Sequence, residues 1–248
     1  MSADDDAAGA EWEAVQQGLA RVRERIGAAA LQHGRAPDEI RLLAVSKRQS
    51  EQKIRAAYAA GQRDFGENYA QELVGKSALL RELPGLRFHM IGHLQRNKCA
   101  SLAGLVSAVH SVDSVRLARE LGRRAALAPV PTAQQLLPGP ELWVFIEVNL
   151  SAEPQKAGCA PTELPELIAA IGAEPALRLR GLMAIPEGEG DPEASRRAFD
   201  ALAELRTRHG GTVILPELSM GMSRDLEVAV ECGSSWVRVG TDIFGARV

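Results

Sequence analysis

The chain begins with a helical pattern of apolar positions. Residues 11–33 place apolar side chains three and four positions apart, which is the spacing of one helix face. A histidine and a glycine, His33 and Gly34, end the pattern. The spacing predicts an amphipathic helix over 11–33.

From residue 41 the pattern changes to short apolar runs that alternate with helical segments. Each run has a length typical of a strand, and several are apolar throughout, which is typical of strands buried on both faces. The predicted strands are Leu42–Ser46, Asp64–Gly66, Phe88–Ile91, Ala108–Ser111, Leu142–Val148, Leu179–Ala184, Val213–Ser219 and Trp236–Val239. The predicted helices among them are 51–60, 68–81, 114–127, 162–171, 192–208 and 224–231.

Strands that alternate with helices form a parallel sheet, which either closes into a barrel or stays open with helices on both faces. Eight such units within 248 residues favour a single (β/α)8 TIM-type barrel with an extra N-terminal helix, since such barrels have about 250 residues. Residues 1–10 are small, acidic and aperiodic, so we expect a disordered tail before one domain over 11–248. The proline-rich segment Ala128–Pro140 is expected to be a surface loop.

Composition and charge exclude several classes of protein. The net charge of −3 gives no general attraction to nucleic acid or to an anionic membrane. No run approaches the roughly 18 apolar residues of a membrane span, and the first residues do not form a targeting peptide. The three cysteines are an odd number without metal-site spacing, as expected of reduced thiols in a cytoplasmic protein. His89 and His93 bracket a strand end, where hydrogen bonding is favoured over metal ligation.

Barrel enzymes carry their working residues where the strands end. Lys47 follows the first predicted strand directly and shares the face of Leu43 and Val45. Apolar walls there would lower the pKa of its amine and favour reaction with an aldehyde. A solvated lysine that ends a strand is the alternative.

The last two predicted strands are followed by residues suited to an anion. Ser219 and Ser223 flank a glycine turn, and Ser223 is expected to cap the helix that starts there. Gly240 and Thr241 follow the last strand, and barrels often bind phosphate in these two loops. Ordinary turn and cap residues are the alternative.

Arg238 lies on the same strand face as Gly240. If that face points into the barrel, its guanidinium needs a buried acceptor, such as a carboxylate or a ring nitrogen; an outward arginine in a salt bridge is the alternative. An amine, a phosphate cradle and a cation for a ring nitrogen together match pyridoxal phosphate. Asn68 or Tyr69, after the second strand, are candidates to face this cofactor.

The same regions carry a resemblance to a known family. The motifs are LLAVSK, GQRDFGENYAQE, FHMIGHLQRNK, HSVDS, VNLSAEPQKAG, GLMAIP and LSMGMSRDLEVAVECGSSWVRVGTDIFGAR, in order from residue 41 to 247. In them the chain resembles the pyridoxal phosphate homeostasis protein family, whose barrel is similar to the N-terminal domain of alanine racemase. The acidic tail and the long proline-rich loop depart from the family pattern.

The resemblance implies a role for each candidate residue. Lys47 would form the internal aldimine of pyridoxal 5'-phosphate, and Arg238 would face its pyridine nitrogen. Asn68 would line the ring. The phosphate would be held by Gly240 and Thr241 together with one of two serines, Ser219 or Ser223.

Two main functions remain open on the sequence, and a weaker third is a barrel enzyme that uses another phosphorylated ligand, with Lys47 as a plain charge. The first is a non-enzymatic carrier or buffer of the cofactor, a monomer or weak homodimer that supplies apo forms of pyridoxal-phosphate enzymes and influences amino-acid and keto-acid balance. The second is an amino-acid racemase, which needs acid/base groups on both faces of the substrate carbon. Tyr69 is the one tyrosine placed to serve beside Lys47, because Tyr58 falls inside a predicted helix. The sequence favours the carrier.

Overall fold

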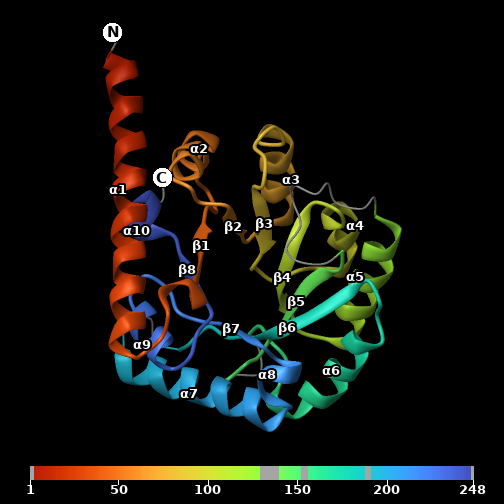
Figure 1. The fold of residues 1–248 in the computed structure, drawn as a ribbon. Coiled ribbons are helices and arrows are strands. Elements are labelled where there is room, and N and C mark those ends of the chain that lie inside the picture. The colour runs from red at the N-terminus through yellow and green to blue at the C-terminus, as the bar shows by residue number, and fades with distance from the viewer. Residues whose placement is uncertain (1–2, 129–139, 152–155, 188–190, 247–248) are drawn as a thin grey trace.

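The strands form a closed parallel barrel, with each strand bonded to the next and β1 bonded to β8. The structure is a computed structural model that describes residues 3–128, 140–151, 156–187 and 191–246. Figure 1 shows the barrel with its helices around it. The strands are β1 Arg41–Val45, β2 Asp64–Glu67, β3 Arg87–Met90, β4 Val106–Val112, β5 Leu142–Glu147, β6 Leu177–Met183, β7 Glu217–Ser219 and β8 Trp236–Val239.

Closure of the barrel decides between the two sheets that the sequence allowed. Four residue pairs join β1 to β8, from Arg41 with Trp236 to Ala44 with Val239. An open sheet would leave these first and last strands as unpaired edges. The predicted (β/α)8 barrel is confirmed.

Helices follow most of the strands and cover the outside of the barrel. Serine and aspartate side chains begin several of them: Ser50 accepts from Lys53 N at 3.4 Å, and Asp191 accepts from Glu193 N at 3.0 Å. The helices are α1 Ala3–Gln32, η1 Pro37–Glu39, α2 Glu51–Ala59, α3 Ala70–Leu79, η2 Arg96–Lys98, α4 Cys99–Leu102, α5 Val115–Leu127, η3 Pro161–Glu163, α6 Leu164–Gly172, α7 Pro192–Arg208, α8 Gly211–Ile214, α9 Leu226–Glu231 and α10 Thr241–Phe244. None of the described helices is both long and apolar enough to cross a membrane.

The long helix α1 lies along one side of the barrel and packs against α2, α9 and α10 (Figure 1). A Cβ at Gly18 would meet the backbone oxygens of Asp242 and Ile243 at 2.6 and 2.7 Å, so α1 and α10 approach this closely only at a glycine. The predicted helix over 11–33 is confirmed. The prediction of a disordered tail over 1–10 needs correction, because α1 begins at Ala3. Alanine has the highest intrinsic preference for helix, and several alanines stand in this stretch.

The predicted strand Val213–Ser219 is correct only at its end. Gly211–Ile214 form the short helix α8, and β7 covers Glu217–Ser219 alone. Gly210 and Gly211 have φ values of 102° and 57°, which turn the chain before the strand, and Val213 is 87% exposed. The apolar run is therefore divided between the helix α8 and the strand β7 and does not form one strand. Residues 129–139 of the predicted proline-rich loop lie outside the described residues.

The inside of the barrel combines aromatic and polar side chains. Trp143, Phe145 and Trp236 fill it together with Leu43 and Met183. Among them lie buried polar side chains, which are His89, His110, Ser219 and Arg238. Buried polar groups need hydrogen-bond partners, so this interior constrains which way those side chains point.

Candidate functional site

One cavity of about 360 Å³ lies where the strands end, at the mouth of the barrel. Its walls come from Val45 in β1, Arg238 in β8 and residues that follow β1, β2, β3, β6, β7 and β8. Six of the seven residues predicted for the cofactor line it, and they are Lys47, Asn68, Ser223, Arg238, Gly240 and Thr241. The prediction that residues from distant parts of the chain meet at one site agrees with this geometry.

Lys47 stands on a constrained piece of backbone. The next residue, Arg48, has a φ of 58°, a left-handed conformation that is unusual outside glycine. The Arg48 N–H donates to Glu72 Oε1 at 2.5 Å, which holds this conformation in place. Backbone strain that the surroundings maintain is common at functional sites, and here it fixes how the chain leaves Lys47.

Beneath Lys47 a buried ion pair fixes the end of β1. Lys76 donates to the Ser46 backbone oxygen at 2.6 Å and to Glu67 Oε1 at 2.7 Å. Ser46 Oγ donates to the same Glu67 oxygen at 2.6 Å. Burial raises the pKa of Glu67, and the charge of Lys76 opposes that rise. This pair cannot be predicted from the sequence, because nothing in the spacing shows that Lys76 on α3 points back toward β1.

Arg238 points into the barrel, so the outward salt-bridged alternative is wrong. Its Nη1 donates to Ser219 O at 2.5 Å and Ser219 Oγ at 3.0 Å, and its Nη2 donates to Ala184 O at 3.0 Å. Burial lowers its pKa to about 10, and the carboxyl of Glu147 opposes that shift. The described hydrogen bonds of Arg238 all come from its two Nη atoms, which leaves the Nε–H for a further acceptor, and the side chain lines the cavity. A ring nitrogen is an acceptor that fits this remaining donor.

Ser219 does not line the cavity. It is fully buried behind Arg238 and bonds to that side chain and to His110. Ser223 does line the cavity, so of the two predicted serines it is the one placed to meet a phosphate. Ser223 is not the helix cap that the sequence predicted, because α9 begins at Leu226 and its N-cap residue is Asp225. Asp225 Oδ1 accepts from Met222 N at 2.6 Å and so holds the loop before the helix.

The turn after β8 forms another wall of the cavity, and its backbone comes close to β1. A Cβ at Gly240 would lie 3.0 Å from the Val45 backbone oxygen, a contact tighter than nearly all real ones. Gly221, in the loop before Ser223, has a φ of 95°. Glycine lets backbone N–H groups approach an oxyanion, and the Thr241 hydroxyl adds a further donor.

Asn68 also lines the cavity and carries a buried acceptor, its Oδ1, without a hydrogen bond among the described residues. Its backbone is held by a close approach to Gly92, where a Cβ would lie 2.3 Å from the Asn68 oxygen. Tyr69, the alternative to Asn68, is 49% exposed and is absent from the walls of the cavity.

Glu147, at the end of β5, is a second group that the sequence analysis missed. It is 5% exposed, and its Oε2 is buried without a partner among the described residues. Burial raises its pKa to about 7, with the Arg238 charge opposing and Asp113 adding to the rise. A glutamate at the end of an apolar strand is the only signal the sequence offers.

The two histidines of the FHMIGHLQRNK segment have separate surroundings. His89 is buried and bonds to Asp64 and His110, whereas His93 pairs with Asp113 at 3.2 Å near the surface. Within the described ranges no cluster of three or more His, Cys, Asp or Glu side chains could hold a metal ion. Hydrogen bonding is therefore the role that the structure gives His89.

Comparisons with known proteins agree with the fold. The family model described as alanine racemase, N-terminal domain, matches residues 18–248. The pyridoxal phosphate homeostasis protein of Pseudomonas aeruginosa is 46% identical over 235 residues, which cover 94% of this chain and 96% of that protein. The chain belongs to the pyridoxal phosphate homeostasis protein family. Another member, from Escherichia coli K12, is 44% identical over 241 residues, covering 94% of this chain and 97% of that protein.

Solved structures extend the comparison. PipY of Synechococcus elongatus, solved with pyridoxal phosphate bound, is 36% identical with a TM-score of 0.73, and the match covers 93% of this chain and all of PipY. Alanine racemase of Corynebacterium glutamicum is 16% identical with a TM-score of 0.66, covering 95% of this chain and 62% of that enzyme. The likeness to the racemase shows a shared barrel alone, whereas family membership rests on the closer relatives.

Proposed function

We propose that this chain binds pyridoxal 5'-phosphate in the cavity and acts in its homeostasis as a carrier or buffer. The observation that carries the proposal is that Lys47, Arg238 and the Gly240–Thr241 turn line one cavity. These groups offer an amine, a donor for a ring nitrogen and a cradle for a phosphate, which the cofactor requires together. The names of the curated relatives and the ligand bound in PipY support it.

Each residue has a distinct part in holding the cofactor. Lys47 supplies the amine to which the cofactor aldehyde attaches covalently and reversibly. Arg238 offers its Nε–H to the ring nitrogen and, as a cation, disfavours a proton on that nitrogen. Gly240, Thr241 and Ser223 bind the phosphate, while Asn68 lies along the ring. Ser219 acts from behind by holding Arg238.

The racemase alternative receives little support from the cavity. Within the described part of the chain, neither a tyrosine nor a histidine lines it. The Tyr69 ring is exposed and packs under Arg48, whose guanidinium lies 5.7 Å from the ring centroid. The homologous proteins are named for homeostasis and not for a reaction. A carrier needs one amine to which the cofactor attaches reversibly, and Lys47 supplies that amine in the cavity.

A carrier also needs recipients. We propose that apo forms of pyridoxal-phosphate enzymes in the cytoplasm take up the cofactor, with the carrier acting as a monomer or weak homodimer. Lys47 is half-buried. This partial exposure is suited to transfer of the cofactor from Lys47 to an amine of another protein.

An absorption spectrum tests the binding. The purified protein with pyridoxal phosphate should show a visible band that borohydride removes, and mass spectrometry should place the reduced adduct on Lys47. Lys53→Ala, on α2 outside the cavity, is the matched control and should keep the band. A band that survives in Lys47→Ala would disprove the covalent role of Lys47.

Two assays separate the carrier from the racemase. Loaded protein should activate an apo enzyme that depends on pyridoxal phosphate, and Lys47→Ala should do so poorly at equal total cofactor. Racemisation of single L-amino acids should stay at the background rate. Turnover that disappears in Tyr69→Phe would establish the racemase instead.

A further inference from the structure

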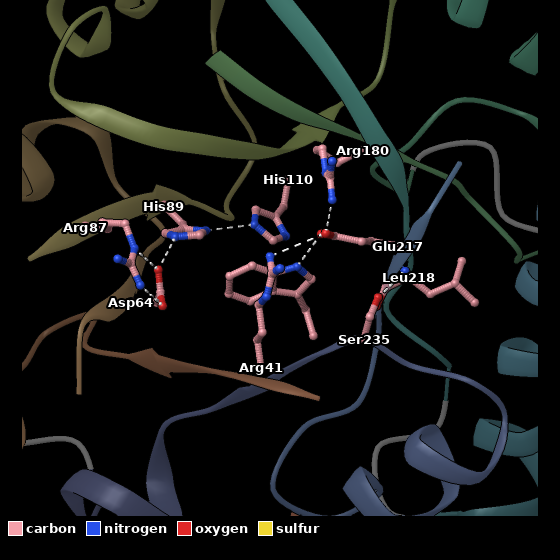
Figure 2. A network of polar contacts seen from close by, with 10 residues as sticks. Arg41, Asp64, Arg87, His89, His110, Arg180, Glu217, Leu218 and Ser235 are labelled. Atoms are coloured by element: carbon pink, nitrogen blue, oxygen red, sulfur yellow. Dashed lines mark hydrogen bonds and ion pairs between the residues drawn. The ribbon is translucent and has the colours of Figure 1, made fainter. Parts of the chain in front are cut away.

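A line of buried hydrogen bonds crosses the barrel from the cavity to its opposite end. Arg238 Nη1 lies 3.0 Å from Ser219 Oγ, and that oxygen lies 2.9 Å from His110 Nδ1. His110 Nε2 lies 3.0 Å from His89 Nδ1, and His89 Nε2 lies 3.0 Å from Asp64 Oδ1. Figure 2 shows the far half of this line, with Arg87 beyond Asp64. We call these five residues the relay.

The direction of the first bonds follows from Arg238. A guanidinium only donates, so Ser219 Oγ accepts from it. The hydroxyl has one other described partner, His110 Nδ1, and it is fully buried. Its hydrogen therefore goes to that nitrogen. Burial holds the pKa of His110 well below its usual range, and the charge of Arg238 acts in the same sense. His110 is then neutral with its hydrogen on Nε2.

The remaining bonds follow in the same direction. His110 Nε2–H donates to His89 Nδ1, so His89 carries its hydrogen on Nε2 and donates to Asp64. Burial alone would raise the pKa of Asp64, but hydrogen bonds from Arg87 and His89 hold it well below its usual range. Asp64 is thus a carboxylate that only accepts, which fits the end of the line. A carboxylate at Asp64 needs a hydrogen on His89 Nε2, which is where the direction set by Arg238 puts it.

Packing holds the two imidazole rings in this orientation. The His110 ring stacks on Phe145 with centroids 4.2 Å apart, and Trp236 lies at its edge at 5.9 Å. The His89 ring lies 5.1 Å from Trp236. Both histidines are fully buried, so water cannot replace a lost relay bond without rearrangement of the barrel interior.

We propose that His110 and His89 are positioning residues for the cofactor: through Ser219 they set the orientation in which Arg238 presents its Nε–H to the ring nitrogen. The inference rests on the proposed function, since it concerns the same cavity. Ser219 Oγ offers its lone pair to Arg238 only while its hydrogen is directed to His110. Without that acceptor the hydroxyl turns, Nη1 loses one of its two acceptors, and the guanidinium tilts.

The first test needs no cofactor. Nitrogen-15 shifts of the imidazole rings report which nitrogen carries hydrogen, and His→Gln variants assign the signals of the five histidines. We expect His89 and His110 to be neutral, each with its hydrogen on Nε2. A hydrogen on Nδ1 of either ring, or a charged His110 at pH 7, would overturn the relay whatever the protein binds.

The second test asks whether the relay acts on the ring nitrogen. Dissociation constants are measured for pyridoxal phosphate and for its 1-deaza analogue, which has carbon in place of that nitrogen. A hydrogen bond from a charged donor is worth about ten- to a hundredfold in affinity, so wild type should prefer pyridoxal phosphate by about that factor. His110→Phe, which keeps a ring but no hydrogen bonds, should lose most of this preference. His110→Gln, which can accept from Ser219 and donate to His89, should restore it.

Controls separate positioning from a general loss of structure. Val109 is the neighbouring residue of β4 and is buried in the core outside the barrel interior. Val109→Ala should weaken the binding of both ligands by the same factor and leave the preference for pyridoxal phosphate unchanged. If His110→Phe does not fold, Ser219→Ala removes the same oxygen and should lose the preference too. If the folded variant, His110→Phe or Ser219→Ala, still prefers pyridoxal phosphate over its 1-deaza analogue, the inference is overturned. Failure of wild type to bind either ligand would instead refute the proposed function, and the ring shifts would still decide the relay.

Discussion

Lys76 Nζ lies 2.6 Å from the backbone oxygen of Ser46, the residue before Lys47. The same amine bonds to Glu67, whose side chain is fully buried, and to Glu72, which also holds the Arg48 N–H. One cation from α3 therefore sets both the end of β1 and the turn that follows it. Lys47 is placed by this support as much as by its own strand.

The support makes Lys76 more important for stability than a surface lysine. Lys76→Met leaves the Glu67 carboxyl buried without its cation, and breaking a buried pair typically costs about 3–5 kcal/mol. The double variant Glu67→Gln/Lys76→Met removes both charges and should recover much of that loss. Urea unfolding of wild type, both single variants and the double variant measures the coupling. Single-variant effects that simply add would show that the two groups do not support each other.

Covalent attachment should appear as extra stability of the loaded protein. A ligand that binds only the folded state stabilises it by about 2.7 kcal/mol at a hundredfold excess over Kd. At one fixed concentration of pyridoxal phosphate, Lys47→Ala should gain less than wild type, because it keeps the phosphate and ring contacts alone. Thermal unfolding with and without cofactor gives both values. Equal gains in the two proteins would mean that attachment to Lys47 contributes nothing to affinity.

The sequence predicted the features that depend on local periodicity. Strands such as Trp236–Val239 and helices such as Pro192–Arg208 have the predicted bounds, because their apolar repeats are long and uninterrupted. Six cavity residues were predicted because a parallel barrel brings all its strand ends to one mouth. The barrel topology alone therefore predicts that these distant residues lie close together, without information on their side-chain contacts.

The predictions that failed depend on side-chain direction and on backbone conformation. Periodicity could not show that Ser219 lies behind Arg238 rather than in the cavity, since both serines flank the same turn. It could not show that Lys76 reaches back from α3, or that His89 and His110 meet inside the barrel. These contacts join residues that are not neighbours in sequence, and only strand pairing, its register and helix packing bring them together.

Gly92 should be irreplaceable for a steric reason. A Cβ there would lie 2.3 Å from the Asn68 backbone oxygen and 2.8 Å from its Cα, so Gly92→Ala must displace a wall of the cavity. We expect weaker pyridoxal phosphate binding and a lower thermal midpoint. Gly75→Ala is the matched control, because no atom lies within 4 Å of its Cβ and alanine in helix α3 should stabilise by up to about 1 kcal/mol. Unchanged binding in Gly92→Ala would show that the Asn68 segment moves without consequence for the site.

Glu147 should make the protein less stable as the pH rises. Its pKa is about 7 in the fold, against 4.5 for the ordinary side chain, because burial disfavours the charge. Below about pH 4.5 both the folded and unfolded states hold the proton. Between pH 4.5 and 7 the unfolded state gives up its proton first, so the free energy of unfolding falls until the folded carboxyl also ionises.

Glu147→Gln removes this loss and should therefore stabilise the protein most at high pH. One pKa unit corresponds to about 1.4 kcal/mol, so the gain at pH 8 should be of the order of 3 kcal/mol, and it should shrink toward pH 4.5. Urea unfolding of both proteins across this range without cofactor measures the difference. Glu166→Gln, which changes an exposed carboxyl on α6, should follow wild type at every pH. Only ionisation of Glu147 makes the gain in the free energy of unfolding depend on pH. The same gain at pH 5 and pH 8 would therefore show that Glu147→Gln acts through packing and not through charge.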